Sequence, residues 1–171
     1  AQLATLAGVT NGSLRHEGKG PWSGTSSRVQ AVINMDGIAT FVSESNIAEA
    51  RDRYESKGEL PVNARWLGGL YEDSPHNWEE ASALLWAGAE SAPVCFISSG
   101  LPRYSDGRDR LVEIYESLGI YTERHRISVD VHPFWFFHPW VDITIEHAVR
   151  FLDRMFKPEK ATGNMLGQES F

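Results

Sequence analysis

Two histidines, each followed by proline, lie among five aromatic residues in the segment VHPFWFFHPW, residues 131–140. An imidazole titrates near neutral pH, so His132 is a candidate general base that could take a proton from a hydroxyl group and return it to a leaving group. The alternative interpretation is purely structural, with the ring packed under Trp135. His138 is predicted to be structural, ordering the turn before Pro139.

A base of this kind needs a carboxylate that fixes its tautomer and stabilises the imidazolium. The segment PRYSDGRD offers Asp109 and Asp106, and Asp130 is a weaker candidate two residues before His132. Asp109 could instead cap the helix expected after it. From the residues alone, all of these alternatives stay open.

Several other side chains are candidates for substrate contacts. The flat apolar rings of Trp135 and, less so, Trp140 could stack on a sugar, and Phe134 could shape an acyl pocket. The same aromatic rings could equally seal a helix against a sheet. Arg103 could contact a sugar hydroxyl or an acidic substituent, or form a surface ion pair, and Asp36 in NMDG is similarly ambiguous.

The elements that position these residues follow from hydrophobic periodicity and turn signals. Strands are predicted over 28–36, 93–98 and 120–127. Helices are predicted over 48–58, from Ser74 or Asn77 onward, over 111–118 and over 145–156, and AQLATLAG reads as a helix interior without a beginning. The apolar stripe expected on the last helix comprises Ile145, Ala148, Val149, Leu152, Met155 and Phe156.

Strands that alternate with helices predict an α/β fold, a mostly parallel sheet with helices on both faces. Functional loops of such sheets follow the carboxyl ends of the strands. This rule selects NMDGIATF, SSGLPRYSDGRD and SVDVHPFWFFHPW. We expect one domain over 1–156 and a loose C-terminal tail over 157–171.

Composition excludes several classes of function. The net charge is −7, from 16 Lys and Arg against 23 Asp and Glu, and no basic run stands out, which argues against nucleic acid. No apolar run approaches the roughly 20 residues of a bilayer span, so no membrane partner is expected. Cys95 is the single cysteine and is predicted to be a small core residue. No cluster of His and carboxylate residues shows ligand spacing, so we expect no metal or organic cofactor.

Taken together, VHPFWFFHPW, PRYSDGRD, WSGTSSRVQAVIN and SPHNWEEAS resemble the C-terminal half of the α/β-hydrolase carbohydrate esterases, which are related to acetylxylan, feruloyl and pectin acetyl esterases. The resemblance covers most of residues 1–156. It aligns the family's Gly-His-Gly-Phe with residues 131–134, which implies that His132 is the catalytic base. The usual acid position aligns near 98–102, where there is no carboxylate. The GRD setting resembles a variant motif of this group and favours Asp109, with Asp106 as the alternative.

The nucleophile of this family lies in a Gly-x-Ser-x-Gly turn, and no such pentapeptide occurs in the sequence. Ser23 and Ser105 have the wrong glycine spacing. The resemblance places Ala1 about two residues beyond the nucleophile. It therefore implies a partner, the N-terminal half of the same hydrolase, which carries the serine and covers a sheet edge that would otherwise be exposed.

The sequence thus predicts a serine carboxylesterase that acts on acetylated or feruloylated plant polysaccharide fragments, with the nucleophilic serine upstream of or outside this chain. The resemblance suggests a secreted or periplasmic protein. The competing prediction is a non-catalytic α/β-hydrolase-like scaffold that binds carbohydrate or a protein partner through its aromatic rim.

Overall fold

The computed structural model describes residues 1–157, and its centre is a sheet of three parallel strands. The strands are β1 (Val32–Met35), β2 (Val94–Ser98) and β3 (Thr122–Arg126), in the order β1-β2-β3. Every residue of β2 is buried, as expected of a central apolar strand, whereas the polar sequence TERHR of β3 suits a sheet edge. The predicted α/β class is confirmed. The expected tail lies outside the described residues except for Lys157.

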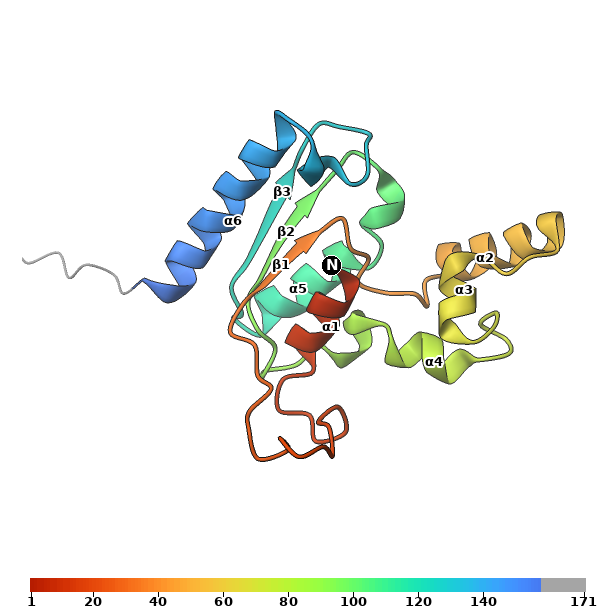
Figure 1. Ribbon diagram of the computed structural model, residues 1–171, viewed down its shortest axis with the longest axis horizontal. Coiled ribbons are helices and arrows are strands. Elements are labelled where there is room, and N and C mark those ends of the chain that lie inside the picture. The colour runs from red at the N-terminus through yellow and green to blue at the C-terminus, as the bar shows by residue number, and fades with distance from the viewer. Residues whose placement is uncertain (158–171) are drawn as a thin grey trace, which may run out of the picture.

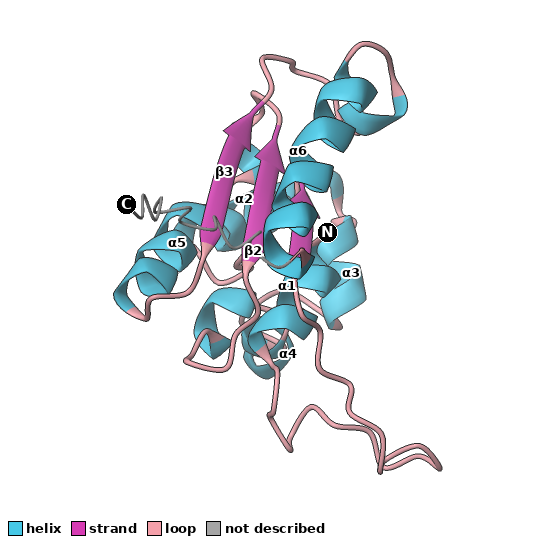
Figure 2. Cartoon of the chain, turned by 90° about the vertical axis from the view of Figure 1, so that its left-hand side faces the viewer, coloured by secondary structure: helices cyan, strands magenta, loops and turns pink. Residues whose placement is uncertain are grey.

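Helices cover both faces of the sheet (Figures 1 and 2). Helices α1 (Gln2–Val9) and α5 (Arg108–Ser117) lie on one face, and α6 (Trp140–Phe156) lies on the other. Side chains alternate along β2, so Val94 and Phe96 pack with the first pair of helices while Cys95 and Ile97 pack under α6. The two resulting cores fix the sheet between its helix layers.

The buried stripe of α6 differs from the predicted one. Of the predicted residues, Ala148, Leu152 and Met155 pack against the core under α6, whereas Ile145, Val149 and Phe156 are exposed. Phe151, which the periodicity argument omitted, is fully buried in the same core. The helix also begins at Trp140, five residues before the predicted start.

A helical arm, residues 44–80, projects away from the sheet (Figure 1). It comprises α2 (Glu44–Lys57), α3 (Val62–Leu67), which was not predicted, and α4 (Pro75–Glu80). Ser43 caps α2 by accepting a hydrogen bond from the backbone of Asn46, and Gly58 ends it in the left-handed conformation. A core separate from that of the sheet holds the arm together and comprises Phe41, Ala50, Ala64, Leu67, Trp78 and Ala81.

Short 3₁₀ turns complete the connections: η1 (Ala83–Trp86), η2 (Pro102–Tyr104) and η3 (Phe134–Phe136). The last two follow the carboxyl ends of β2 and β3, in the loops that the sequence selected as functional. Over residues 1–157, no helix has both the length and the apolar character that crossing a bilayer requires.

Candidate active site

The carboxyl ends of β1 and β3 bring Asp36 and His132 together. Oδ2 of Asp36 lies 3.1 Å from Nδ1 of His132, and Oδ1 accepts a hydrogen bond of 2.7 Å from the backbone N–H of Ser99. The Asp36 side chain is 0% exposed, while that of His132 is 32% exposed. A carboxylate only accepts hydrogen bonds, so the pairing places the proton on Nδ1 and leaves Nε2 as a free base.

The turn after β1 holds Asp36 in an unusual backbone conformation, with φ of 50°. Aspartate is among the few non-glycine residues that adopt this left-handed region at low cost. Asn34 braces the turn, because its buried amide donates to the carbonyl of Gly37 and accepts from the Gly37 N–H. The same amide donates to the Thr5 hydroxyl of α1 at 2.7 Å, which ties the turn to that helix.

Two aromatic rings orient the His132 imidazole. Tyr104 of η2 stacks on it with ring centroids 4.0 Å apart and an interplanar angle of 17°. Trp135 meets it edge-on at 5.1 Å and 86°. The ring is thus held by three loops, one after each strand, and its orientation does not depend on the hydrogen bond alone.

The predicted pairing of Asp109 with His132 is not found. Asp109 is 65% exposed and pairs with Arg108 and Arg124 at the start of α5. A hydrogen bond and the charge of Arg108, together with Arg124, lower its pKa despite partial burial. It lies in the first turn of α5, where its carboxylate is held by these two arginines.

The other carboxylates near the loop also have separate roles. Asp106 accepts hydrogen bonds from Ser43, from Ser45 at 3.2 Å and from the Asn46 amide at 2.8 Å, so it joins the loop after β2 to the start of α2. Asp130 is exposed and packs beside Gly100. Asp36, which the sequence left ambiguous, is therefore the carboxylate that the fold brings to His132.

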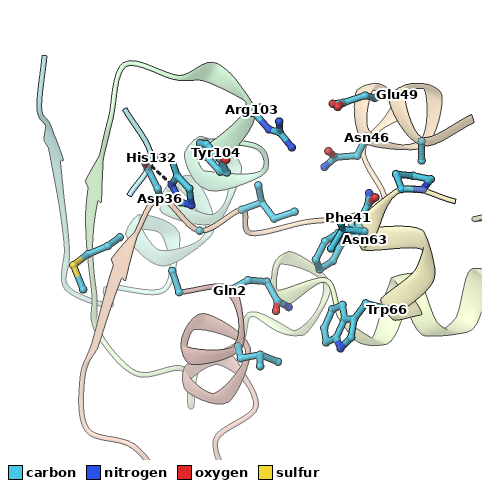
Figure 3. Close-up of a pocket in the computed structure, with 18 of the residues that line it drawn as sticks. Gln2, Asp36, Phe41, Asn46, Glu49, Asn63, Trp66, Arg103, Tyr104 and His132 are labelled. Carbon is cyan, nitrogen blue, oxygen red and sulfur yellow. Dashed lines mark hydrogen bonds and ion pairs between the residues drawn. The ribbon is translucent and has the colours of Figure 1, made fainter. Parts of the chain in front are cut away.

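A cavity of about 560 Å³ opens beside this pair, between the sheet and the helical arm. Ligand pockets typically measure about 300–1,000 Å³. Figure 3 shows His132, Asp36, Tyr104 and Arg103 at one side and residues of the arm, among them Asn46 and Trp66, at the other. The cavity is therefore large enough for a sugar-sized ligand, with the imidazole at its wall.

The predicted substrate-contacting residues divide between the cavity and the core. Trp135, Arg103 and Asp36 line the cavity, and the Arg103 guanidinium lies 5.2 Å from the ring centre of Tyr104. Phe134 is fully buried in the core under α6, because η3 turns it inward, so the predicted acyl-pocket role is not supported. Trp140 packs partly into the same core.

His138, predicted to be structural, pairs with the first turn of α6. Its Nδ1 lies 2.9 Å from Oδ2 of Asp142, one turn further along α6. The side chain is exposed and does not line the cavity.

Several residues that line the cavity were not predicted from the sequence. They come from the loop after β1, from the arm and from η2, and comprise Phe41, Asn46, Glu49, Asn63, Trp66 and Tyr104. Trp66 is the most informative of them, because a tryptophan more than half exposed in a cavity wall offers a stacking surface. No periodic pattern marks it, since α3 has only six residues.

The beginning of α1 forms part of the cavity wall. Ala1, Gln2 and Leu3 line it together with the turn that carries Asp36. The approach is close: a Cβ atom at Gly37 would lie 2.5 Å from the Cβ of Ala1 and 2.8 Å from the backbone nitrogen of Gln2. Only glycine at this position lets the helix start meet the turn without a shift.

No hydroxyl or thiol of residues 1–157 hydrogen-bonds to His132. Ser23 lies exposed in the long loop after α1, and the Ser105 hydroxyl donates to the carbonyl of Pro102. Cys95 is fully buried, and burial together with the charge of Glu123 raises the pKa of its thiol to about 12. The described residues thus bring an imidazole and a carboxylate together, and no hydroxyl or thiol among them hydrogen-bonds to the imidazole.

The three parallel strands with helices on both faces match the fold of α/β-hydrolase-like solved structures. No family model matches the sequence, and no curated protein matches it. A thermophilic esterase from the Planctomycetes species Thermogutta terrifontis, with butyrate bound, has a TM-score of 0.51 and 17% identity over 77% of this chain and 45% of its own.

Two further solved structures show the same likeness. A truncated carbohydrate esterase from gut microbiota has a TM-score of 0.52 and 16% identity, over 86% of this chain and 56% of its own. An acetyl ester-xyloside bifunctional hydrolase from Caldicellulosiruptor lactoaceticus has a TM-score of 0.54 and 14% identity, over 90% of this chain and 53% of its own. At these identities the likeness establishes the fold. The chain spans about half the length of these structures.

Proposed function

We propose that this chain supplies the base and the orienting acid of a serine carboxylesterase, with His132 as the base and Asp36 as the acid. The observation that carries the proposal is the hydrogen bond between the buried Asp36 carboxylate and Nδ1 of His132 at the wall of the cavity. The sequence favoured Asp109 as the acid, but the geometry of the site favours Asp36.

The reaction would proceed through an acyl-enzyme. Nε2 of His132 takes the proton of a serine hydroxyl as its oxygen attacks the ester carbonyl, and then gives that proton to the leaving sugar oxygen. Water attacks the acyl-enzyme in the same way and releases the carboxylic acid. Asp36 stabilises the imidazolium in each step without taking up a proton itself.

The nucleophilic serine would lie on a polypeptide segment upstream of or separate from this chain. The beginning of α1 supports this position, since Ala1 and Gln2 line the same cavity wall as Asp36. A serine presented there would be near His132, and the backbone N–H groups of the first turn of α1 would face developing negative charge. We propose the N-terminal half of the hydrolase as the partner, paired with the free edge of β1.

An acylated plant polysaccharide fragment, acetylated or feruloylated, is the proposed substrate. Trp66 and Trp135 offer aromatic surfaces, and Asn46, Asn63 and Arg103 offer hydrogen bonds to sugar hydroxyls. The carbohydrate esterase and the acetyl ester-xyloside hydrolase among the similar structures add support for this class of substrate.

The test is hydrolysis of p-nitrophenyl acetate by the complemented protein, in which this chain is produced together with the segment that bears the serine. His132→Ala should lower the rate by several orders of magnitude. His138→Ala is the matched control, because His138 is exposed and has its own aspartate partner, Asp142. An undiminished rate in His132→Ala would rule out the proposed base.

The second candidate is a non-catalytic scaffold that binds carbohydrate through the same cavity. The exposed ring of Trp66 favours it, because a stacking surface serves binding as well as catalysis. Under this alternative, His132→Ala leaves oligosaccharide affinity nearly unchanged, and no complemented form hydrolyses acetyl esters.

A further inference from the structure

A second group of reactive side chains lies on the opposite face of the sheet from α1, under α6. Cys95 of β2 and Glu123 and His125 of β3 each offer one ligand atom, and these atoms all lie within 4.8 Å of one another. The group is separate from the cavity beside His132, because none of its three residues lines that cavity.

Strand register explains why residues so far apart in the sequence meet. Cys95 pairs with Glu123 in the parallel ladder, so their side chains leave the sheet side by side on the same face. His125 is two residues beyond Glu123 and therefore projects from that face as well. The positions are set by backbone pairing, and they do not depend on flexible loops.

The donor set is that of a borderline-soft divalent metal. Cysteine sulfur, histidine nitrogen and a carboxylate oxygen are the ligands of Zn²⁺, at about 2.0–2.3 Å from the ion. Tetrahedral geometry then separates neighbouring ligand atoms by roughly 3.5 Å. Oε2 of Glu123 and Nε2 of His125 lie 2.8 Å apart, within hydrogen-bonding distance, so at most one proton lies between them. A metal ion would replace that proton and move the two atoms apart by less than about 1 Å.

The surroundings fit ligation. A hydrogen bond of 2.6 Å from the Tyr121 hydroxyl holds the Glu123 carboxylate. His147 of α6 stacks on His125 with centroids 3.8 Å apart and an interplanar angle of 17°, which fixes the plane of the ligand ring.

The group is also reachable from solvent. β3 is an edge strand of the described sheet, and the side chains of Glu123 and His125 are 18% and 26% exposed. Cys95 is fully buried behind them. An ion would enter from the edge, with a water molecule completing its coordination on the open side.

We propose that Cys95, Glu123 and His125 form a binding site for a divalent metal ion of the zinc class, with three protein ligands and one water. His147 is a positioning residue for His125. Neither the esterase proposal nor the carbohydrate-binding alternative requires this site, so its test is independent of both.

Titration of the chelator-treated chain with Co²⁺, followed by absorption spectroscopy, tests the proposal. A cobalt–thiolate charge-transfer band in the near ultraviolet should grow and saturate at one ion per chain, because only a bound cysteine gives this signal. Cys95→Ser should abolish the band, and His125→Gln should raise the dissociation constant at least tenfold, which corresponds to about 1.4 kcal/mol.

His138→Gln is the control, because it removes an exposed imidazole with a carboxylate partner that lies outside the group. It should leave the titration unchanged. His125 is partly exposed, so His125→Gln tests the site even if the buried Cys95 substitution destabilises the fold. The proposal is overturned if Co²⁺ produces no thiolate band, or if the band and affinity persist in His125→Gln.

Discussion

Replacing Asp36 by asparagine should switch the tautomer of His132. The asparagine amide oxygen can still accept the hydrogen bond from the Ser99 N–H. Its amino group then faces Nδ1 and can only donate, so the imidazole proton moves to Nε2 and the free base is lost. In a complemented enzyme, we expect the catalytic rate constant to fall by about 10⁴, the usual scale for an acid-to-amide change in such a triad.

The effect on folding should be much smaller than the effect on catalysis. Exchanging one charge-assisted hydrogen bond for a neutral one costs about 1 kcal/mol. Asp36→Ala should cost at least about 2 kcal/mol more, because the buried Ser99 N–H loses its acceptor and alanine is strained in the left-handed region. Asp36→Asn therefore removes the catalytic function of the carboxylate with little loss of stability, whereas Asp36→Ala also disrupts the local fold.

Nitrogen-15 NMR of the histidine rings reads the tautomer directly, without a nucleophile. The native chain should show His132 protonated at Nδ1, and Asp36→Asn should show it protonated at Nε2. Asp109→Asn is the control, since Asp109 is exposed and pairs with arginines. If Asp109→Asn changes the tautomer and Asp36→Asn does not, the assignment of the orienting acid is wrong.

Three further predictions concern the cavity, α6 and the histidine stack. Trp66→Ala should weaken binding of a xylo-oligosaccharide about tenfold by calorimetry, while Trp22→Ala, which removes an exposed tryptophan outside the cavity, should leave it unchanged. Phe151→Ala should lower the free energy of unfolding by about 3–5 kcal/mol in urea, against less than about 1 kcal/mol for exposed Val149→Ala, and equal losses would contradict the packing of α6. His147→Gln should flatten the pH dependence of stability in mildly acidic solution.

The sign of this last effect follows from the lowered pKa of His147. Burial is the main cause, and the neighbouring His125 and Arg150 add to it, while Glu146 and Glu123 oppose it. Below about pH 6.5 the unfolded chain takes up a proton that the folded chain does not, so stability falls as pH falls toward the folded pKa. Urea unfolding between pH 7 and 5 measures this, and an unchanged slope in His147→Gln would refute it.

The sequence predicted the sheet well because its signals are local. The apolar run at β2 and the turn residues around α2 and α5 determine structure through residues that are only a few positions apart in the sequence. The predicted start of α6 was wrong, and its predicted stripe was right only for Ala148, Leu152 and Met155, because the packing angle of a helix is a tertiary property. Phe151 lies outside the predicted stripe, yet it is fully buried in the same core as Cys95 and Ile97.

The site was predictable only in part. His132 follows from its residue type and its place after the last strand. Its partner was missed because Asp109 had the more suggestive sequence setting, whereas Asp36 depends on the left-handed turn and on Asn34, neither of which is visible in a motif. The group around Cys95 was missed because the register of β2 and β3 places Cys95 opposite Glu123, and this register cannot be predicted from the spacing of residues in the sequence.

Labelling the complemented protein with a fluorophosphonate, followed by mass spectrometry of the labelled peptide, tests the central claim most directly. The account predicts one labelled serine, on a segment upstream of or separate from this chain, and loss of the label in both His132→Ala and Asp36→Asn. No label, or a label that persists in both variants, would contradict a role for this histidine and aspartate in activating a serine.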